Sequence, residues 1–274
     1  MIMHILNVKE LSFKYKDKPI LEKINITIDR GDIVGLVGEN GAGKTTLMKV
    51  ISGILLSYTG KVEVNTDSIG ILIEEPSLYN DMTVLANLKF YCRLYTKPYS
   101  KIEEFKDVLN VDKYLNKKVS KLSLGMKQRV GLFVALLASE ELILLDEPTN
   151  GLDPTGTVEL LNLIKKLSHE LGITFIISSH ILSNLDKICN KSLILKDKQI
   201  TLIDSSVGQY KVFPYNISQK ELVYLFEKGK IEFKNKGKDV IVSDIGIVEK
   251  FLKENKVDYY TEAVSLSEVY FNEE

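Results

Sequence analysis

Gly38-Glu39-Asn40-Gly41-Ala42-Gly43-Lys44-Thr45 is the stretch that decides the fold of this 274-residue chain. It follows the apolar run 33–37, which has the character of a buried strand, and it precedes 46–51, whose apolar spacing predicts a helix that ends near Gly53. A G-x-x-x-x-G-K-T motif that connects a strand to a helix predicts a phosphate-binding loop. The alternative is a glycine-rich turn that matches by chance, and the flanking strand and helix argue against it.

The chemistry of this loop suits a polyphosphate. Glycines let the backbone curl so that successive N–H groups point inward, and the helix N-terminus adds partial positive charge. We expect residues 38–46, Thr46 included, to bind a nucleotide. Lys44 is placed to reach the terminal phosphates and to take part in catalysis, and the Thr45 hydroxyl is a candidate Mg²⁺ ligand.

Composition limits the class of protein. Hydrophobic residues make up 45% and charged residues 27% of the chain, as in soluble globular proteins, and the net charge of −1 gives no bulk attraction to nucleic acid. Cys92 and Cys189 lie far apart in apolar surroundings, which predicts small core residues of a reduced cytoplasmic protein. No signal peptide is evident, and the longest apolar stretch, 130–138, is too short to span a bilayer.

Alternating strand and helix patterns predict an α/β fold with a mainly parallel sheet. Paired strands are expected over 5–30, forming an antiparallel β subdomain, and a helical segment is expected from Thr83, its N-cap, to about Asn116. This segment begins an inserted helical lobe over about 82–130. The remaining elements are short strands near 62–64 and 69–73, a helix over 123–138, a strand over 142–145, a helix over 157–171 and strands over 174–177 and 192–195.

The pattern changes after about residue 205, which divides the chain into expected domains 1–205 and 206–274. The second domain is expected to be a small α+β unit of the split βαβ, ferredoxin-like type. Its expected order is strand, helix, strand, strand, helix, strand, over 209–213, 218–228, 230–234, 239–242, 244–255 and 257–263. A short helix over 266–271 would close it.

Two acids follow the apolar run 142–145. Carboxylates at the end of a buried strand suit two tasks beside a phosphate loop. Asp146 is expected to bind Mg²⁺, and Glu147 is expected to orient and polarise an attacking water molecule. A strand that ends in a solvated acidic turn is the alternative, and it is common when no phosphate loop accompanies it.

Three further segments complete a set of motifs, Leu122–Arg129, Gly151–Pro154 and Ser178–His180. In order and spacing they resemble the ATPase subunits of ABC transporters over roughly residues 5–203. The resemblance implies the P-loop NTPase fold of ABC ATPases. It also implies that Ser123 and Gly125 belong to the signature loop, which opens a helix and caps the γ-phosphate of ATP bound to the other subunit.

The same resemblance implies roles for other residues. His180 matches the switch histidine that contacts the γ-phosphate and positions Glu147, and Asp153 matches the acid that passes between two subunits. Tyr15 matches the aromatic residue that stacks on adenine, although its alternation with Leu11 and Phe13 fits a core position nearly as well.

Three positions depart from the usual ABC pattern. Leu124 and Met126 replace Gly and Gln in the signature, and Glu74 stands where the loop after 69–73 normally has Gln. These departures, with the C-terminal appendage, resemble the bacitracin-resistance and lantibiotic-immunity branch. A Gln at this position would offer a neutral oxygen to Mg²⁺, and a carboxylate is a stronger ligand for a hard cation, so Glu74 is a candidate Mg²⁺ ligand. The alternative is that Glu74 turns away from Mg²⁺ and pairs with a basic residue of the permease.

The sequence thus predicts an ATPase that binds ATP and Mg²⁺ and pairs head to tail with a second identical or different ATPase subunit. A separate integral membrane permease is the expected partner, with the chain held on the inner face of the cell membrane and no nucleic acid bound. Export of a peptide antibiotic or another hydrophobic compound is the expected task. The alternatives are a soluble ABC ATPase acting on ribosomes or DNA, and a P-loop kinase, which needs no signature loop.

Overall fold

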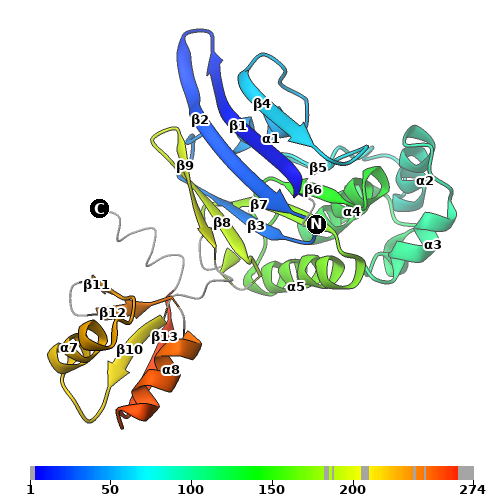
Figure 1. Ribbon diagram of the computed structural model, residues 1–274. Coiled ribbons are helices and arrows are strands. Elements are labelled where there is room, and N and C mark those ends of the chain that lie inside the picture. The colour runs from blue at the N-terminus through cyan, green and yellow to red at the C-terminus, as the bar shows by residue number, and fades with distance from the viewer. Residues whose placement is uncertain are drawn as a thin grey trace. The chain divides into compact units, whose positions relative to one another are not determined.

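The computed structural model of the chain describes residues 4–181, 185–186, 188–204, 210–236, 239–243 and 245–264. The chain divides into two compact units, 1–203 and 204–274, called here the large unit and the small unit. Figure 1 shows both, with the small unit in yellow to red.

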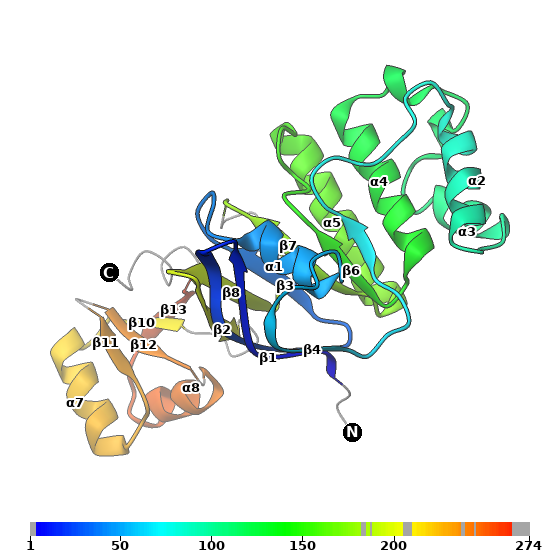
Figure 2. The same cartoon turned by 90° about the horizontal axis from the view of Figure 1, so that it is seen from above.

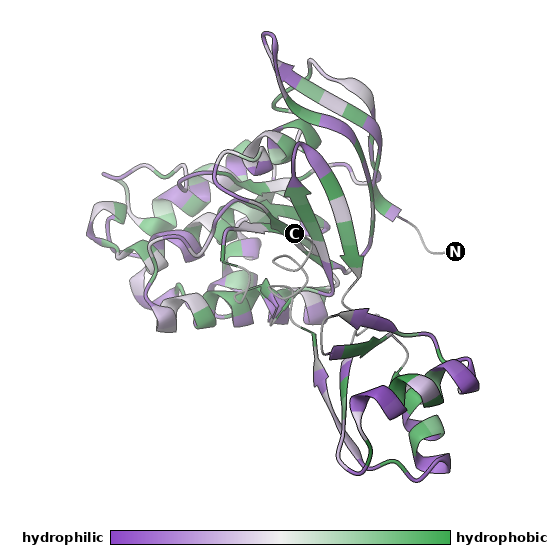
Figure 3. Ribbon diagram, turned by 90° about the vertical axis from the view of Figure 1, so that its left-hand side faces the viewer, coloured by the Kyte–Doolittle hydropathy of each residue, from purple (hydrophilic) through white to green (hydrophobic). Residues whose placement is uncertain are grey.

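A six-stranded sheet forms the centre of the large unit, in the order β5-β6-β7-β3-β8-β9. Neighbours from β5 to β8 are parallel. The strands are β3 (Ile33–Val37), β5 (Gly70–Leu72), β6 (Leu142–Leu145), β7 (Thr174–Ser179), β8 (Lys191–Lys196) and β9 (Gln199–Asp204). Strands β3, β6 and β7 are buried throughout, because both faces of the sheet are covered. Figure 3 colours the ribbon by hydropathy, with hydrophobic residues in green. The predicted parallel α/β sheet is confirmed.

The second layer is a three-stranded antiparallel sheet in the order β2-β1-β4. Its strands are β1 (His4–Tyr15), β2 (Lys18–Asp29) and β4 (Thr59–Val64). Helix α1 (Lys44–Ile51) lies between this sheet and the parallel one (Figure 2). Leu47, Met48, Val50 and Ile51 of α1 join one hydrophobic core with residues from both sheets, and this packing holds the helix that follows the glycine-rich loop.

The remaining helices of the large unit begin with α2 (Val84–Leu94) and α3 (Ser100–Lys106), followed by short 3₁₀ turns at Asp112–Tyr114 and Val119–Lys121. Helix α4 (Leu124–Ala138) packs on β5, and α5 (Pro154–Leu171) packs on β7. Among the described residues, every helix is too short or too polar to cross a bilayer.

The helical lobe differs from the continuous pattern expected over 83–116. Thr83 does cap α2, since its hydroxyl accepts a hydrogen bond from Ala86 N. The helix ends at Leu94 because Thr96 takes a left-handed conformation (φ 55°) and Pro98 follows, and a residue before proline disfavours the helical region. Helix α5 begins at Pro154, three residues before the expected start at Thr157, because Asp153 caps it.

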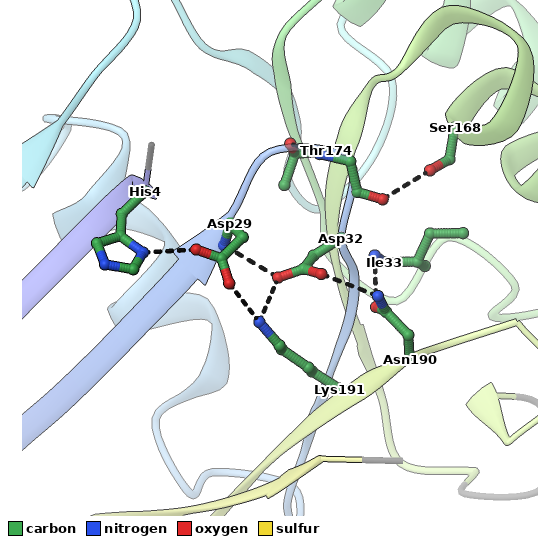
Figure 4. Close-up of polar contacts among 9 residues, drawn as sticks. His4, Asp29, Asp32, Ile33, Ser168, Thr174, Asn190 and Lys191 are labelled. Atoms are coloured by element: carbon green, nitrogen blue, oxygen red, sulfur yellow. Dashed lines mark hydrogen bonds and ion pairs between the residues drawn. The ribbon is translucent and has the colours of Figure 1, made fainter. Parts of the chain in front are cut away.

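A polar network ties the antiparallel sheet to the parallel sheet (Figure 4). Lys191, the first residue of β8, donates hydrogen bonds to Asp29 Oδ2 at 2.9 Å and Asp32 Oδ2 at 2.7 Å. Asn190 Nδ2 donates to Asp32 Oδ1 at 2.8 Å, and His4 Nδ1 lies 2.5 Å from Asp29 Oδ1. Residues from three segments that are distant in sequence are therefore held at the edge where β3 and β8 begin.

The small unit has a four-stranded sheet in the order β11-β12-β10-β13, and all neighbouring pairs are antiparallel. In chain order its elements are β10 (Tyr210–Pro214), α7 (Gln219–Gly229), β11 (Lys234–Lys236), β12 (Asp239–Val242), α8 (Ile245–Glu254) and β13 (Tyr259–Ala263). This order is that of a split βαβ unit, as expected from the sequence.

Two elements of the small unit differ in extent or coverage from those expected. The strand expected over 230–234 begins only at Lys234, because Lys230 ends α7 in a left-handed conformation (φ 54°) and Ile231 N bonds back to Phe226 O. The helix expected over 266–271 lies outside the described residues.

Candidate functional site

The glycine-rich loop 38–45 connects β3 to α1. Gly43, the N-cap of α1, has φ 114°, and a Cβ there would lie 2.9 Å from Ile20 Cγ2. A Cβ at Gly38 would lie 2.7 Å from the backbone oxygen of Leu195. The packing around this loop therefore requires glycine at both ends, and it brings the backbone N–H groups at the start of α1 to one exposed loop.

Lys44 is buried, with 6% of its surface exposed, and its ammonium contacts the backbone of the loop itself. Its Nζ donates to the carbonyl oxygens of Gly38 at 2.7 Å and Glu39 at 3.2 Å. The same ammonium lies 3.4 Å from Glu147 Oε1. These contacts hold a positive charge beside the loop, where a terminal phosphate would need one.

Asp146 comes directly after β6 and is 5% exposed. Its Oδ2 accepts a hydrogen bond from Thr45 Oγ1 at 2.5 Å, and its Oδ1 accepts one from Ser178 Oγ at 2.5 Å. A buried carboxylate facing two hydroxyls is an oxygen-rich group of the kind that suits a hard cation. Ser178 lies in the Ser178–His180 segment but is not among the site residues predicted from the sequence, because its contact with Asp146 depends on β6 and β7 being neighbours.

Glu147 follows Asp146 in a left-handed backbone conformation (φ 48°), which is uncommon outside glycine. Its N–H donates to Ser178 Oγ at 2.8 Å. Its Oε2 lies 2.8 Å from His180 Nδ1, whereas its buried Oε1 has no hydrogen-bond partner within the described structure. One buried oxygen of this carboxylate is thus left without a hydrogen-bond donor, at the point where Lys44 and His180 converge.

The three segments that carry these side chains meet for a topological reason. Strands β3, β6 and β7 are parallel neighbours, and the loop with Lys44, the pair Asp146–Glu147 and His180 each follow one of their carboxyl ends. Ligands of open α/β sheets bind at this edge. The structure therefore brings together the residues that the sequence proposed separately for phosphate, metal and water.

Glu74 does not contact this group of residues directly. It lies two residues after β5 with φ 66° and is exposed, and its Oε1 lies 2.7 Å from Lys49 Nζ. Lys49 was not among the residues singled out from the sequence, which contains no signal for a contact across 25 positions.

Tyr15 is 48% exposed, so the core position considered for it is wrong. Its ring meets Phe13 edge-on, with centroids 4.8 Å apart. Phe13 is buried, and Tyr15 ends the same strand with about half of its surface exposed.

Ser123 and Asp153 line a separate cleft of about 450 Å³ that contains no residue of the 38–45 loop. Each caps a helix: Ser123 Oγ accepts from Met126 N at 3.3 Å, and Asp153 Oδ1 accepts from Gly156 N at 2.8 Å. Gly125 also lines this cleft. Two helix N-termini that open onto one cleft give a second surface suited to an anion.

Comparison with known proteins agrees with this geometry. The profile of the ABC transporter family matches residues 21–150. The bacitracin transport ATP-binding protein BcrA of Enterococcus faecalis is 38% identical over 205 residues, which are 69% of this chain and 66% of that protein. The lantibiotic transport ATP-binding protein SrtF of Streptococcus pyogenes is 35% identical over 194 residues, 68% of this chain and 84% of that protein. Among solved structures, cbiO1 of Clostridium perfringens, part of the transporter complex cbiONQ, superposes with a TM-score of 0.68 and 28% identity over 74% of this chain and 90% of that one.

Proposed function

The chain belongs to the ATP-binding subunits of ABC transporters, and from this premise we propose that it hydrolyses Mg-ATP to power a separate membrane permease. Members of this family bind ATP and are ATPases in general. The observation that carries the proposal is the meeting of Lys44, Glu147 and His180 beside the glycine-rich loop.

Each residue of this site has a task in phosphoryl transfer. The loop 38–45 and the N-terminus of α1 bind the phosphates, and Thr46 belongs to the same first turn. Lys44 moves its ammonium from the carbonyls of Gly38 and Glu39 to the terminal phosphate. Glu147 orients and polarises the attacking water, and His180 holds the Glu147 carboxylate.

The residues present fit Mg²⁺. Thr45 and Asp146 offer a hydroxyl and a carboxylate at 2.5 Å from each other. These are oxygen donors, which suit Mg²⁺, and this ion usually takes its remaining ligands from phosphate oxygens and water. The bound ion would neutralise charge on the β- and γ-phosphates.

A second copy or a related subunit completes the site. Ser123 and Gly125 line the cleft with Asp153, and none of the loop residues lines it. A head-to-tail pair would bring the α4 N-terminus of one subunit to the phosphates held by its partner's loop, with one ATP in each of two shared sites. Tyr15, exposed at the end of β1, would then stack on the adenine.

The permease is proposed to meet the large unit at a groove of about 580 Å³ beside α2 and α4. Glu75–Asn80, Tyr91, Val119, Leu124 and Lys127 line it, so it adjoins Glu74. A protein seated there would contact the segment that follows β5 and thereby sense the nucleotide site. We accordingly expect the chain at the inner face of the cell membrane, and we propose export of a peptide antibiotic or another hydrophobic compound as the task. The names of BcrA and SrtF, which refer to bacitracin transport and lantibiotic transport, support a peptide antibiotic as the transported compound.

The test is recruitment to a membrane. The tagged chain is expressed in its own cells, and the detergent-solubilised membranes are purified on the tag. We expect a stable complex whose ATP hydrolysis responds to the transported compound, and loss of the complex in Lys127→Glu. The matched control is Lys166→Glu on α5, which lies outside the groove and should leave assembly intact. Co-purification with ribosomes or DNA and no membrane protein would contradict the proposal.

A further inference from the structure

Lys49 and Glu74 form an ion pair next to the proposed metal site. Lys49 lies on α1, four residues after Thr45, so the two side chains share one face of the helix. The Lys49 ammonium is 2.7 Å from Glu74 Oε1, with the lysine side chain 27% and the glutamate side chain 68% exposed. The segment after β5 is thereby tied to the helix that begins at the phosphate loop.

Each member of this ion pair shifts the pKa of the other, and neighbouring groups add to the shift of Lys49. The hydrogen bond from Lys49 lowers the pKa of Glu74, and the hydrogen bond to Glu74 raises the pKa of Lys49. Tyr15 and Asp146 also raise the pKa of Lys49 through their electrostatic interactions. Lys49 therefore lies within the electric field of the carboxylate to which Thr45 donates, and both members of the pair stay charged at neutral pH.

We propose that Lys49 is a positioning residue of the nucleotide site, which holds Glu74 in a neutral ion pair beside the bound Mg-ATP. The inference rests on the proposed function, because it assumes that Mg-ATP binds at Thr45 and Asp146. It explains how a carboxylate can occupy a position where a neutral amide is usual. A lone carboxylate would repel the phosphates and attract the cation, whereas a paired one adds no net charge.

The ion pair predicts opposite effects on Mg²⁺ preference when its negative member or its positive member is neutralised. Glu74→Gln leaves an unpaired positive charge, which favours metal-free ATP and disfavours Mg²⁺. Lys49→Gln leaves an unpaired negative charge, which disfavours metal-free ATP and favours Mg²⁺. The double variant Lys49→Gln/Glu74→Gln is neutral again. The two single changes should therefore shift the preference for Mg-ATP over ATP in opposite directions, and the double change should cancel them.

The experiment is calorimetric titration of the full-length chain with ATP, in EDTA and in excess Mg²⁺, which gives the ratio of the two dissociation constants. We expect this Mg²⁺ preference to fall about threefold to tenfold in Glu74→Gln, to rise by a similar factor in Lys49→Gln, and to return to within about twofold in the double variant. Added salt near ~1 M should shrink both shifts. Lys106→Gln, which removes the partner of Glu103 in α3, is the matched control and should leave the ratio unchanged.

Thermal unfolding of each variant verifies that it is folded. Shifts of the same sign in both single variants, or a double variant that is not restored, would overturn the role of Lys49. Loss of the Mg²⁺ preference in Glu74→Gln together with an unchanged ratio in Lys49→Gln would make Glu74 a direct Mg²⁺ ligand and also overturn it. A wild-type chain without affinity for Mg-ATP would instead contradict the proposed function itself.

Discussion

The imidazole of His180 and the carboxylate of Glu147 meet at 2.8 Å although they lie on different segments, one after β7 and one after β6. The contact leaves the second oxygen of Glu147 buried, 3.4 Å from the Lys44 ammonium and without a hydrogen bond. Glu147 thus contacts His180 through one oxygen and lies near Lys44 of the glycine-rich loop through the other. The proposed role of Glu147 requires a carboxylate that is held in place yet keeps one oxygen without a structural hydrogen bond, and the contacts of its two oxygens meet that requirement.

Replacing Glu147 should separate binding from chemistry. Glu147→Gln keeps the shape of the side chain but removes its capacity to polarise water, so we expect ATP affinity to persist and turnover to fall about a hundredfold or more. The ATP-bound dimer should then accumulate and be visible by size-exclusion chromatography. Near-normal hydrolysis in this variant would remove Glu147 from the catalytic role.

Two defective variants should complement each other if each site is shared. Ser123→Arg places a bulky cation at the α4 N-terminus and should block hydrolysis, while ATP binding to the single chain stays largely intact. Lys44→Ala should be inactive for a different reason, the loss of the phosphate-binding ammonium. In a mixed dimer, one site combines the intact loop with the intact signature, so activity should reappear on mixing. Two inactive proteins that remain inactive together would argue against shared sites.

The exposed ring of Tyr15 should contribute to nucleotide affinity. Base stacking on an aromatic side chain is worth about 1–3 kcal/mol, so Tyr15→Ala should weaken ATP binding about tenfold, whereas Tyr15→Phe should retain most of it. Tyr79→Ala is the control, since Tyr79 is similarly exposed at 49% but lines the groove beside α2. Equal affinity in Tyr15→Ala and wild type, measured by titration with a fluorescent nucleotide, would exclude stacking at this position.

The Lys191 network should give the fold a pH-dependent stability. The hydrogen bond from Lys191 lowers the pKa of Asp29 below its ordinary value of 3.8. A carboxylate with a depressed folded pKa contributes stability that is fully present above its unfolded pKa, and this contribution is lost as pH falls through the folded pKa. Lys191→Gln should therefore lower the free energy of unfolding by about 1–3 kcal/mol at neutral pH, and the difference from wild type should shrink below about pH 4.

The control for this network is Lys198→Gln. Lys198 pairs with Glu22 at 3.1 Å, but both side chains are 45% exposed, and such surface pairs contribute about 0–1 kcal/mol. Urea unfolding at several pH values compares the two variants. A Lys191→Gln effect that equals the Lys198→Gln effect, or that does not change with pH, would mean that the network does not stabilise the fold in this way.

Local sequence signals predicted those parts of the site that depend on neighbouring residues. The glycine-rich loop, the acids after β6 and the cap at Thr83 all follow from patterns a few residues long. The parallel sheet followed from alternating buried strands and helices, because a strand with both faces covered needs an apolar run.

Contacts between distant segments could not be predicted in the same way. Ser178 bridges Asp146 and Glu147 across 32 and 31 positions, and Lys49 reaches Glu74 across 25. Their geometry depends on which strands become neighbours and on how α1 is packed between two sheets. The helical lobe was misjudged for a local reason, since its apolar spacing continues past the point where Thr96 and Pro98 end α2.

The most direct test of the account is the specific rate of Mg-ATP hydrolysis by the purified chain, measured over a wide range of protein concentrations. If two subunits share each ATP, the rate per molecule should rise with protein concentration and level off as dimers saturate, and Lys44→Ala should reduce it to background. A rate per molecule that stays constant on dilution down to the monomer, or hydrolysis that survives Lys44→Ala, would contradict the claim that this chain is an ATPase working through its glycine-rich loop as a dimer.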